Sequence, residues 1–245
     1  MIYTKGLRAG LVFASCLALS ACFGNSSGGA GGGGGTGGGG AGGGTLPASA
    51  AEFDTKFDQL SANTSGLAPT STALTGTATF TGATKVSLFE AANPANTGEA
   101  IGALAVEANF DSNTISGTAT NFQGTVNGQS VALTGTLDTA TALAPSTLSE
   151  QSNPIVLPPG IPAIPGAPTS VTTNAFAINM GGELSDPDGV IGTVNLGLGG
   201  AFLGPIGGSE ATAAVGPATV VVTNVPGSTG LINIGGAGEF YLERN

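Results

Sequence analysis

From residue 73 onward, apolar side chains alternate with threonine and other polar side chains, and this period of two most constrains the fold. A β-strand places successive side chains on opposite faces of its sheet, so the alternation predicts strands with one buried face. Glycine at Gly82 predicts a break after the first strand. The expected strands cover 73–81, 84–90, 104–110, 114–122, 131–137, 171–180, 194–202, 219–223 and 231–242.

These segments predict an all-β fold, a single small antiparallel β-barrel of about eight strands over residues 70–245. Glycines inside the strands are typical of small barrels, whose sheets must bend sharply to close. Phe110 and Phe202 each share a period-two face with Leu or Val, so both are expected to point into the core.

Short polar segments between the strands predict tight turns. Asn127-Gly128 is the strongest of them, because both residues adopt a positive φ easily. Asp111-Ser112-Asn113 reads as a second reversal, and Ser185–Gly189 as a third. Asp186 and Asp188 have the spacing of a calcium loop, but the other ligands of an EF-hand are missing, which favours turn chemistry.

A proline-rich excursion is expected over residues 140–169, because proline cannot donate a ladder hydrogen bond. It is interpreted either as a stiff connection at the barrel rim or as a recognition loop. Its exposed aliphatics on a backbone restricted by proline make it the candidate partner-binding segment. The candidate residues are Ile155, Val156, Leu157, Pro158, Pro159 and Ile161.

The first residues have the order of an export signal: a basic start, an uncharged run from Ala9 to Leu19, and small residues. Leu19-Ser20-Ala21-Cys22 resembles the lipobox of bacterial lipoproteins. The resemblance implies cleavage after residue 21, lipid on Cys22, and further acylation of the palmitate type. A plain secretory signal is the alternative. The residue after the cysteine is Phe23, not the Asp of an inner-membrane retention signal, which favours the outer membrane. The expected location is therefore the cell outer membrane, lipid-anchored and surface-exposed.

Residues 22–49 are glycine-rich and predict a flexible tether between the lipid and the barrel. A short amphipathic helix is expected over residues 50–62. Ser49 and Glu52 have capping-box spacing, and Phe53, Phe57 and Leu60 form one apolar stripe. The stripe is expected to lie on the barrel or to plug one end of it; a partner-binding helix is the alternative.

Composition excludes several classes of function. The chain has 5 Lys and Arg against 15 Asp and Glu, so binding to nucleic acid is not expected. It has no histidine, which removes imidazole metal sites and His-dependent triads. No cofactor, metal or catalytic residues are predicted. For haem, only Met180 and Tyr241 remain as side-chain ligands, and both are expected to pack within strands.

Five short glycine-containing or aromatic segments of the expected barrel carry a family resemblance: 74–82 (LTGTATFTG), 108–111 (ANFD), 114–117 (TISG), 200–205 (GAFLGP) and 235–240 (GGAGEF). They resemble the barrel segments of transferrin-binding protein B-like surface lipoproteins. The chain departs from the family at Gly204-Pro205-Ile206-Gly207 and at Phe80, where tyrosine is common. Its length allows one barrel, so transferrin binding itself is not implied. The resemblance implies capture of a nutrient such as haem or an iron carrier.

The leading hypothesis is a non-catalytic, surface-tethered protein that binds a protein partner or a host or environmental ligand. A structural or adhesive envelope lipoprotein is the second hypothesis. An enzyme is disfavoured, because Glu107, Glu239 and Glu243 show no spacing that pairs them. An integral outer-membrane barrel is disfavoured by the lipid anchor and the scarcity of aromatic residues.

Overall fold

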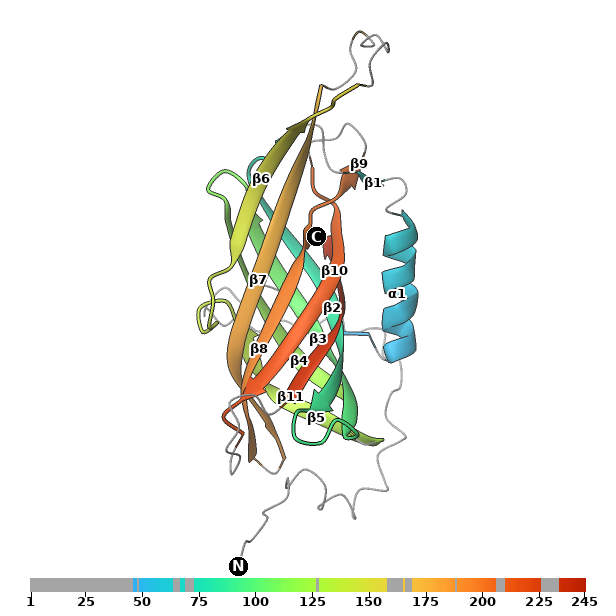
Figure 1. Cartoon of the computed structure of the whole chain (residues 1–245), viewed down its shortest axis with the longest axis vertical. Coiled ribbons are helices and arrows are strands. Elements are labelled where there is room, and N and C mark those ends of the chain that lie inside the picture. The colour runs from blue at the N-terminus through green and yellow to red at the C-terminus, as the bar shows by residue number, and fades with distance from the viewer. Residues whose placement is uncertain are drawn as a thin grey trace, which may run out of the picture. The chain divides into compact units, whose positions relative to one another are not determined.

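An antiparallel sheet that closes on itself makes up most of the structure, a computed structural model (Figure 1). The described residues all lie within one compact unit, residues 41–245. They are residues 46–47, 49–63, 67–68, 73–126, 128–157, 165, 169–187, 189–205, 210–225 and 234–245.

Eight strands follow one another around the barrel in the order β5-β4-β3-β2-β11-β10-β8-β7, and pairing of β5 with β7 closes it. Each strand runs antiparallel to its neighbours. The prediction of an all-β barrel of about eight strands is confirmed. The bounds are β2 Thr77–Glu90, β3 Thr97–Asn109, β4 Thr114–Val126, β5 Gln129–Asp138, β7 Ser170–Asp186, β8 Gly189–Ala201, β10 Ala213–Thr223 and β11 Ile234–Arg244.

A ninth strand, β6 (Thr147–Pro154), corrects the prediction that residues 140–169 form an excursion without strands. The second half of β7 pairs with β5, and its first half pairs with β6, from Thr147 opposite Ala177 to Pro154 opposite Ser170. The alternation signal is weak there because Leu148 is the only buried side chain of β6. Pro154 is tolerated because it stands at the end of the strand.

The predicted break at Gly82 is also wrong, since β2 runs through it without interruption. A Cβ at Gly82 would collide with the backbone of Tyr241 on β11, so this glycine permits close approach of two strands. The predicted turns are confirmed where they are described. Gly128 has a φ of 78° between β4 and β5. The Asp186 carboxylate accepts a hydrogen bond of 3.0 Å from the Gly189 N–H.

Phenylalanine rings from distant parts of the chain fill one end of the barrel interior. Phe202 is at the centre, with its ring centroid 4.8 Å from that of Phe80, 5.3 Å from that of Phe110 and 4.7 Å from that of Phe176. Phe176 also contacts Phe240, at 6.0 Å. The prediction that Phe110 and Phe202 point inward is confirmed. Further along the barrel, the fully buried side chains include Leu104, Leu137, Ile178, Met180, Leu198 and Leu242.

The helix α1 (Ala50–Asn63) lies on the outer wall of the barrel (Figure 1). Its N-cap is present, because the Glu52 N–H donates a 3.2 Å hydrogen bond to Ser49 Oγ. The predicted helix is therefore confirmed, and of its two expected positions the structure shows the one on the wall. Two short strands, β1 (Leu67–Ala68) and β9 (Gly204–Pro205), pair with each other outside the main sheet.

Phe202→Ala should lower the free energy of unfolding by about 3–5 kcal/mol, because it leaves a cavity where four rings meet. Chemical denaturation of the full chain measures the effect. Phe89→Ala is the matched control, since Phe89 is 47% exposed, and it should cost far less. Equal midpoints for the two variants would contradict the central position of Phe202.

Candidate functional site

Part of the predicted site lies outside the described residues. This applies to the lipidation motif Leu19-Ser20-Ala21-Cys22, and also to Pro158, Pro159 and Ile161. Lipid attachment at Cys22 stays a prediction from the sequence.

The other three candidate partner-binding residues lie at the outer end of the hairpin that β6 forms with β7. Ile155, Val156 and Leu157 follow β6 directly and are 40%, 85% and 42% exposed. The Ile155 N–H donates a 2.8 Å hydrogen bond to the carbonyl of Thr169, so the ladder continues past Pro154. Figure 1 shows this hairpin extending beyond the neighbouring strands. Three consecutive exposed aliphatic side chains on such a projection are typical of an interaction surface.

The two strands of this hairpin are nearly uncharged and rich in Ser, Thr, Asn and Gln, and the exposed aliphatic residues lie at its outer end. Glu150 is the only charged residue between Asp138 and Glu183. The face of β7 that continues the barrel interior carries Thr172 and Asn174, which are 5% and 2% exposed. The Asn174 Nδ2 group has no hydrogen-bond partner among the described residues. A buried donor without a hydrogen-bond partner costs about 1–3 kcal/mol of folding free energy, so the Asn174 side chain destabilises this end of the interior.

The second candidate surface is the place where α1 meets the barrel wall. The apolar stripe of α1 packs on Ala83 of β2, Ile101 of β3 and Tyr241 of β11. The Phe53 ring, fully buried, lies 5.3 Å from the Tyr241 ring. Sequence reasoning did not find this contact, because Ala83 and Ile101 fall outside the expected strands and Tyr241 is expected only to pack within one. The available signal was that Ile101 and Tyr241 are large apolar side chains with glutamate two residues away, at Glu99, Glu239 and Glu243.

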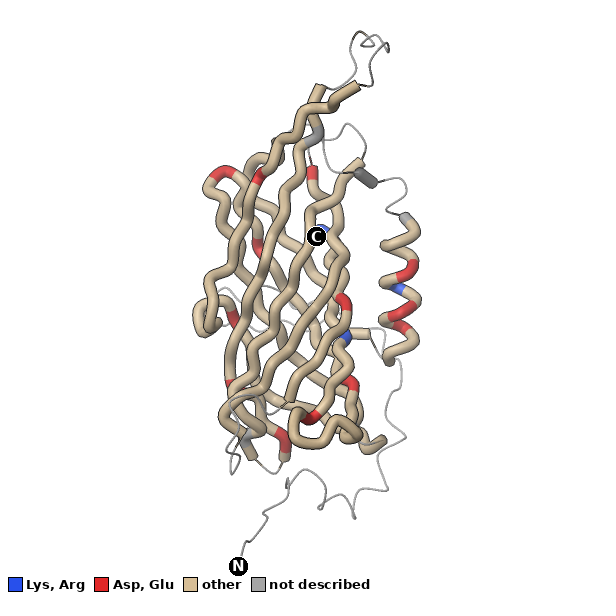
Figure 2. Tube along the Cα trace, viewed as in Figure 1, with Lys and Arg blue, Asp and Glu red and all other residues tan. Residues whose placement is uncertain are grey.

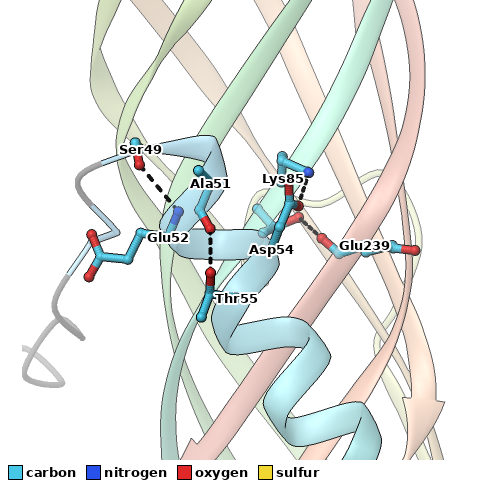
Figure 3. A network of polar contacts seen from close by, with 8 residues as sticks. Ser49, Ala51, Glu52, Asp54, Thr55, Lys85 and Glu239 are labelled. Carbon is cyan, nitrogen blue, oxygen red and sulfur yellow. Dashed lines mark hydrogen bonds and ion pairs between the residues drawn. The ribbon is translucent and has the colours of Figure 1, made fainter.

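Two ion pairs flank this helix contact, and Figure 3 shows the one between Lys85 and Asp54. Lys85 of β2 pairs with Asp54 of α1, and its Nζ lies 5.3 Å from the centre of the Phe53 ring. Lys56 lies 3.7 Å from Glu243 on β11. The two lysines thus join helix and wall at two levels. Exposed pairs of this kind contribute little, about 0–1 kcal/mol each, so the buried apolar contact dominates.

Tyr241 does not present an open ligand group. Burial, with the nearby carboxylates of Glu243 and Glu52, raises the pKa of Tyr241 to about 12. The phenol is therefore neutral at physiological pH, and Phe53 covers its ring. Met180, the other side chain considered for haem, is fully buried within the barrel. Neither side chain is open to a haem at the surface.

A shallow depression of about 490 Å³ lies on the side of the barrel, at the ends of β2, β3 and β4. Its lining combines the half-exposed ring of Phe89, hydroxyls of Ser87 and Thr97, and the carboxylate of Glu99. A Cβ at Gly235 would lie 2.9 Å from the Phe89 ring, so the ring rests on this glycine. Packing between strands therefore accounts for the position of Phe89.

Figure 2 shows that the positions of acidic residues are spread over the barrel and α1. Among the described residues, no group of three or more His, Cys, Asp or Glu is placed to hold a metal ion. Glu107 lies on β3, while Glu239 and Glu243 lie on β11.

Comparison with models of protein families, with curated proteins and with solved structures finds no match. In the described part of the chain, no helix has both the length and the apolar character needed to span a membrane.

The raised pKa of Tyr241 gives a pH dependence of stability with a defined sign. The unfolded pKa is about 10, so the stabilising effect is complete below pH 10 and is lost as the pH rises towards 12. Tyr241→Phe has no phenol to ionise, so its urea midpoint should fall less over this range than that of the parent chain. Lysine titration affects both proteins equally. Identical pH profiles would contradict the burial of the phenol.

Proposed function

We propose that this chain is a lipid-anchored surface protein of the outer membrane that binds a partner without catalysis. In this proposal Cys22 carries the lipid, the glycine-rich residues 22–49 act as the tether, and the barrel presents the β6–β7 hairpin. The partner is a protein or an environmental ligand. The resemblance to transferrin-binding protein B-like lipoproteins favours a nutrient carrier, such as a carrier of iron or haem.

The observation that carries this proposal is the exposed run Ile155-Val156-Leu157 at the end of the projecting hairpin. Docking costs less backbone entropy here than in a flexible loop, because the β6–β7 ladder already holds the backbone up to Ile155. The packed interior adds support. Because phenylalanine rings occupy the end of the barrel around Phe202, a partner is expected to bind outside the barrel.

The distribution of polarity supports a barrel that stands in water. Apolar side chains fill the interior, and the outward positions of β2 and β3 carry threonine, Lys85, Glu99 and Glu107. A transmembrane barrel shows the opposite arrangement, with apolar side chains facing lipid. The lipid on Cys22 would then be the membrane attachment.

A structural or adhesive envelope lipoprotein is the competing proposal. It shares the anchor and the barrel but needs no specific partner. The two proposals differ in what the hairpin does, and the second experiment below separates them.

Cys22→Ser should abolish lipid attachment, because the thioether with diacylglycerol needs the cysteine sulfur. Metabolic labelling of expressing cells with a clickable palmitate measures it. Cys16→Ser is the matched control and should keep the label, since Cys16 lies before the expected cleavage site. Equal labelling of the parent and Cys22→Ser would refute the anchor.

Replacing residues 154–168 with a short Gly-Ser linker should leave the barrel folded and weaken partner capture at least about tenfold, since this removes the exposed aliphatic anchor. Pull-down from a natural extract, followed by titration of the captured partner, measures it. Phe89→Ser, which removes an exposed ring elsewhere, should leave capture unchanged. A folded linker variant with full capture would favour the structural role.

A further inference from the structure

The strand β6 has one unpaired edge. It pairs with β7 on one side, and its other side approaches β4 but forms no ladder with a described strand. The β4–β5 ladder ends at Asp138, before β6 begins. Seven of its eight residues are exposed, Leu148 being the exception. Natural edge strands are usually protected by charged side chains, bulges or internal proline. Before its terminal proline, β6 has a single feature of this kind, the charge of Glu150.

The ladder with β7 shows which backbone groups face this free edge. The Ile155 N–H bonds to the carbonyl of Thr169 directly opposite, so odd-numbered residues of β6 direct their backbone groups to β7. The N–H and C=O groups of Leu148, Glu150 and Ser152 therefore point away from β7. They form a regular row that an antiparallel strand can pair with.

Charge favours a second copy of this chain as the occupant. The chain has a formal net charge of −10, so two copies repel each other over most of their surfaces. Glu150 is the only charge between Asp138 and Glu183, so repulsion is weakest along the β6–β7 hairpin. Two antiparallel registers pair most residues of β6 with β6 of the second copy. One has its two-fold axis at Glu150, and the other has it at Gln151. The first places Glu150 opposite Glu150, while the second places Glu150 opposite Ser152.

The Gln151 register also covers the apolar residues at both ends of β6. It places Ile155 opposite Thr147 of the second copy, and extends Leu157 towards the segment that contains Leu143. Leu143 is 79% exposed, and the segment around it packs over Gly181 of β7. By two-fold symmetry the same contacts form twice.

We propose that β6 is a homodimerisation edge, which pairs antiparallel with β6 of a second copy about a two-fold axis at Gln151. The result is one continuous sheet across two barrels. This inference goes beyond the proposed function, and it depends on neither lipid attachment nor an external partner.

Disulfide trapping tests the register in the full chain carrying Cys16→Ser and Cys22→Ser, whose only thiol is then the introduced one. In the proposed dimer the two Gln151 residues form a non-hydrogen-bonded pair, with Cα atoms about 4.5 Å apart. That separation suits a disulfide. Gln151→Cys should therefore shift from monomer to dimer on a non-reducing gel after mild oxidation, with no other protein present.

Ser149→Cys and Asn153→Cys are the matched controls, because they lie on the same face of the same strand. In the proposed dimer, Ser149 of one copy is opposite Asn153 of the other. Each lies about 13 Å from the same residue in the second copy. Neither should cross-link alone, but an equimolar mixture should. A Gln151→Cys protein that stays monomeric would overturn the proposal, as would equal cross-linking of the three single variants.

Charge substitution gives an independent test without a thiol. Ser152→Lys places a cation opposite Glu150 of the second copy, and Ser152→Glu places a like charge there. With two such pairs per dimer, the dissociation constant should fall about 2- to 30-fold for Lys and rise similarly for Glu. Sedimentation equilibrium measures it. The same changes at exposed Ala132 control for net charge, and equal shifts at both positions would overturn the register.

Discussion

The contact on which the barrel depends most is the cluster of phenylalanine rings around Phe202. Four of these rings come from β2, the β3–β4 turn, β7 and the segment after β8, so the cluster joins strands on different sides of the barrel. Aliphatic side chains such as Leu104, Ile178 and Leu198 fill the rest of the interior. Each ring removes a large apolar area from water, which is the main favourable term in folding.

Because the interior is filled in this way, the proposed partner would bind outside the barrel. An apolar area of the outer wall, around Tyr241, is covered by α1. Among the described residues, the large apolar side chains that stay exposed are those of Phe89, Leu143 and the run Ile155-Val156-Leu157. The β6–β7 hairpin carries this run at its outer end and the unpaired edge along β6, so the proposed partner surface and the proposed dimer edge lie on the same projection.

Much of this could be predicted from the sequence, because alternation fixes which side of a strand each residue occupies. The inward positions of Phe110 and Phe202, the turn after Val126 and the capped helix all follow from local chemistry. The strand β6 could not be predicted. It carries one inward apolar residue, Leu148, and is recruited by hydrogen bonds to β7, whose extra length no local pattern reveals.

The position of α1 on the wall was equally beyond local reasoning. The stripe of Phe53, Phe57 and Leu60 shows that the helix needs an apolar surface, but not which one. That choice depends on Ala83, Ile101 and Tyr241 becoming neighbours, which requires the register of β2 with β3 and with β11, a strand distant in the sequence.

The claim that the barrel is closed and filled is tested most directly by titrating the full-length Cys22→Ser chain with a fluorescent fatty acid. A packed interior predicts no saturable binding, either to this chain or to the same chain with Tyr241→Phe. Phe202→Ala should open a cavity, and its binding of the same fatty acid is compared with that of the parent chain at the same concentrations. Saturable one-to-one binding to the chain with Phe202 intact, abolished by Met180→Trp at the centre of the barrel, would show an open lumen and contradict the account.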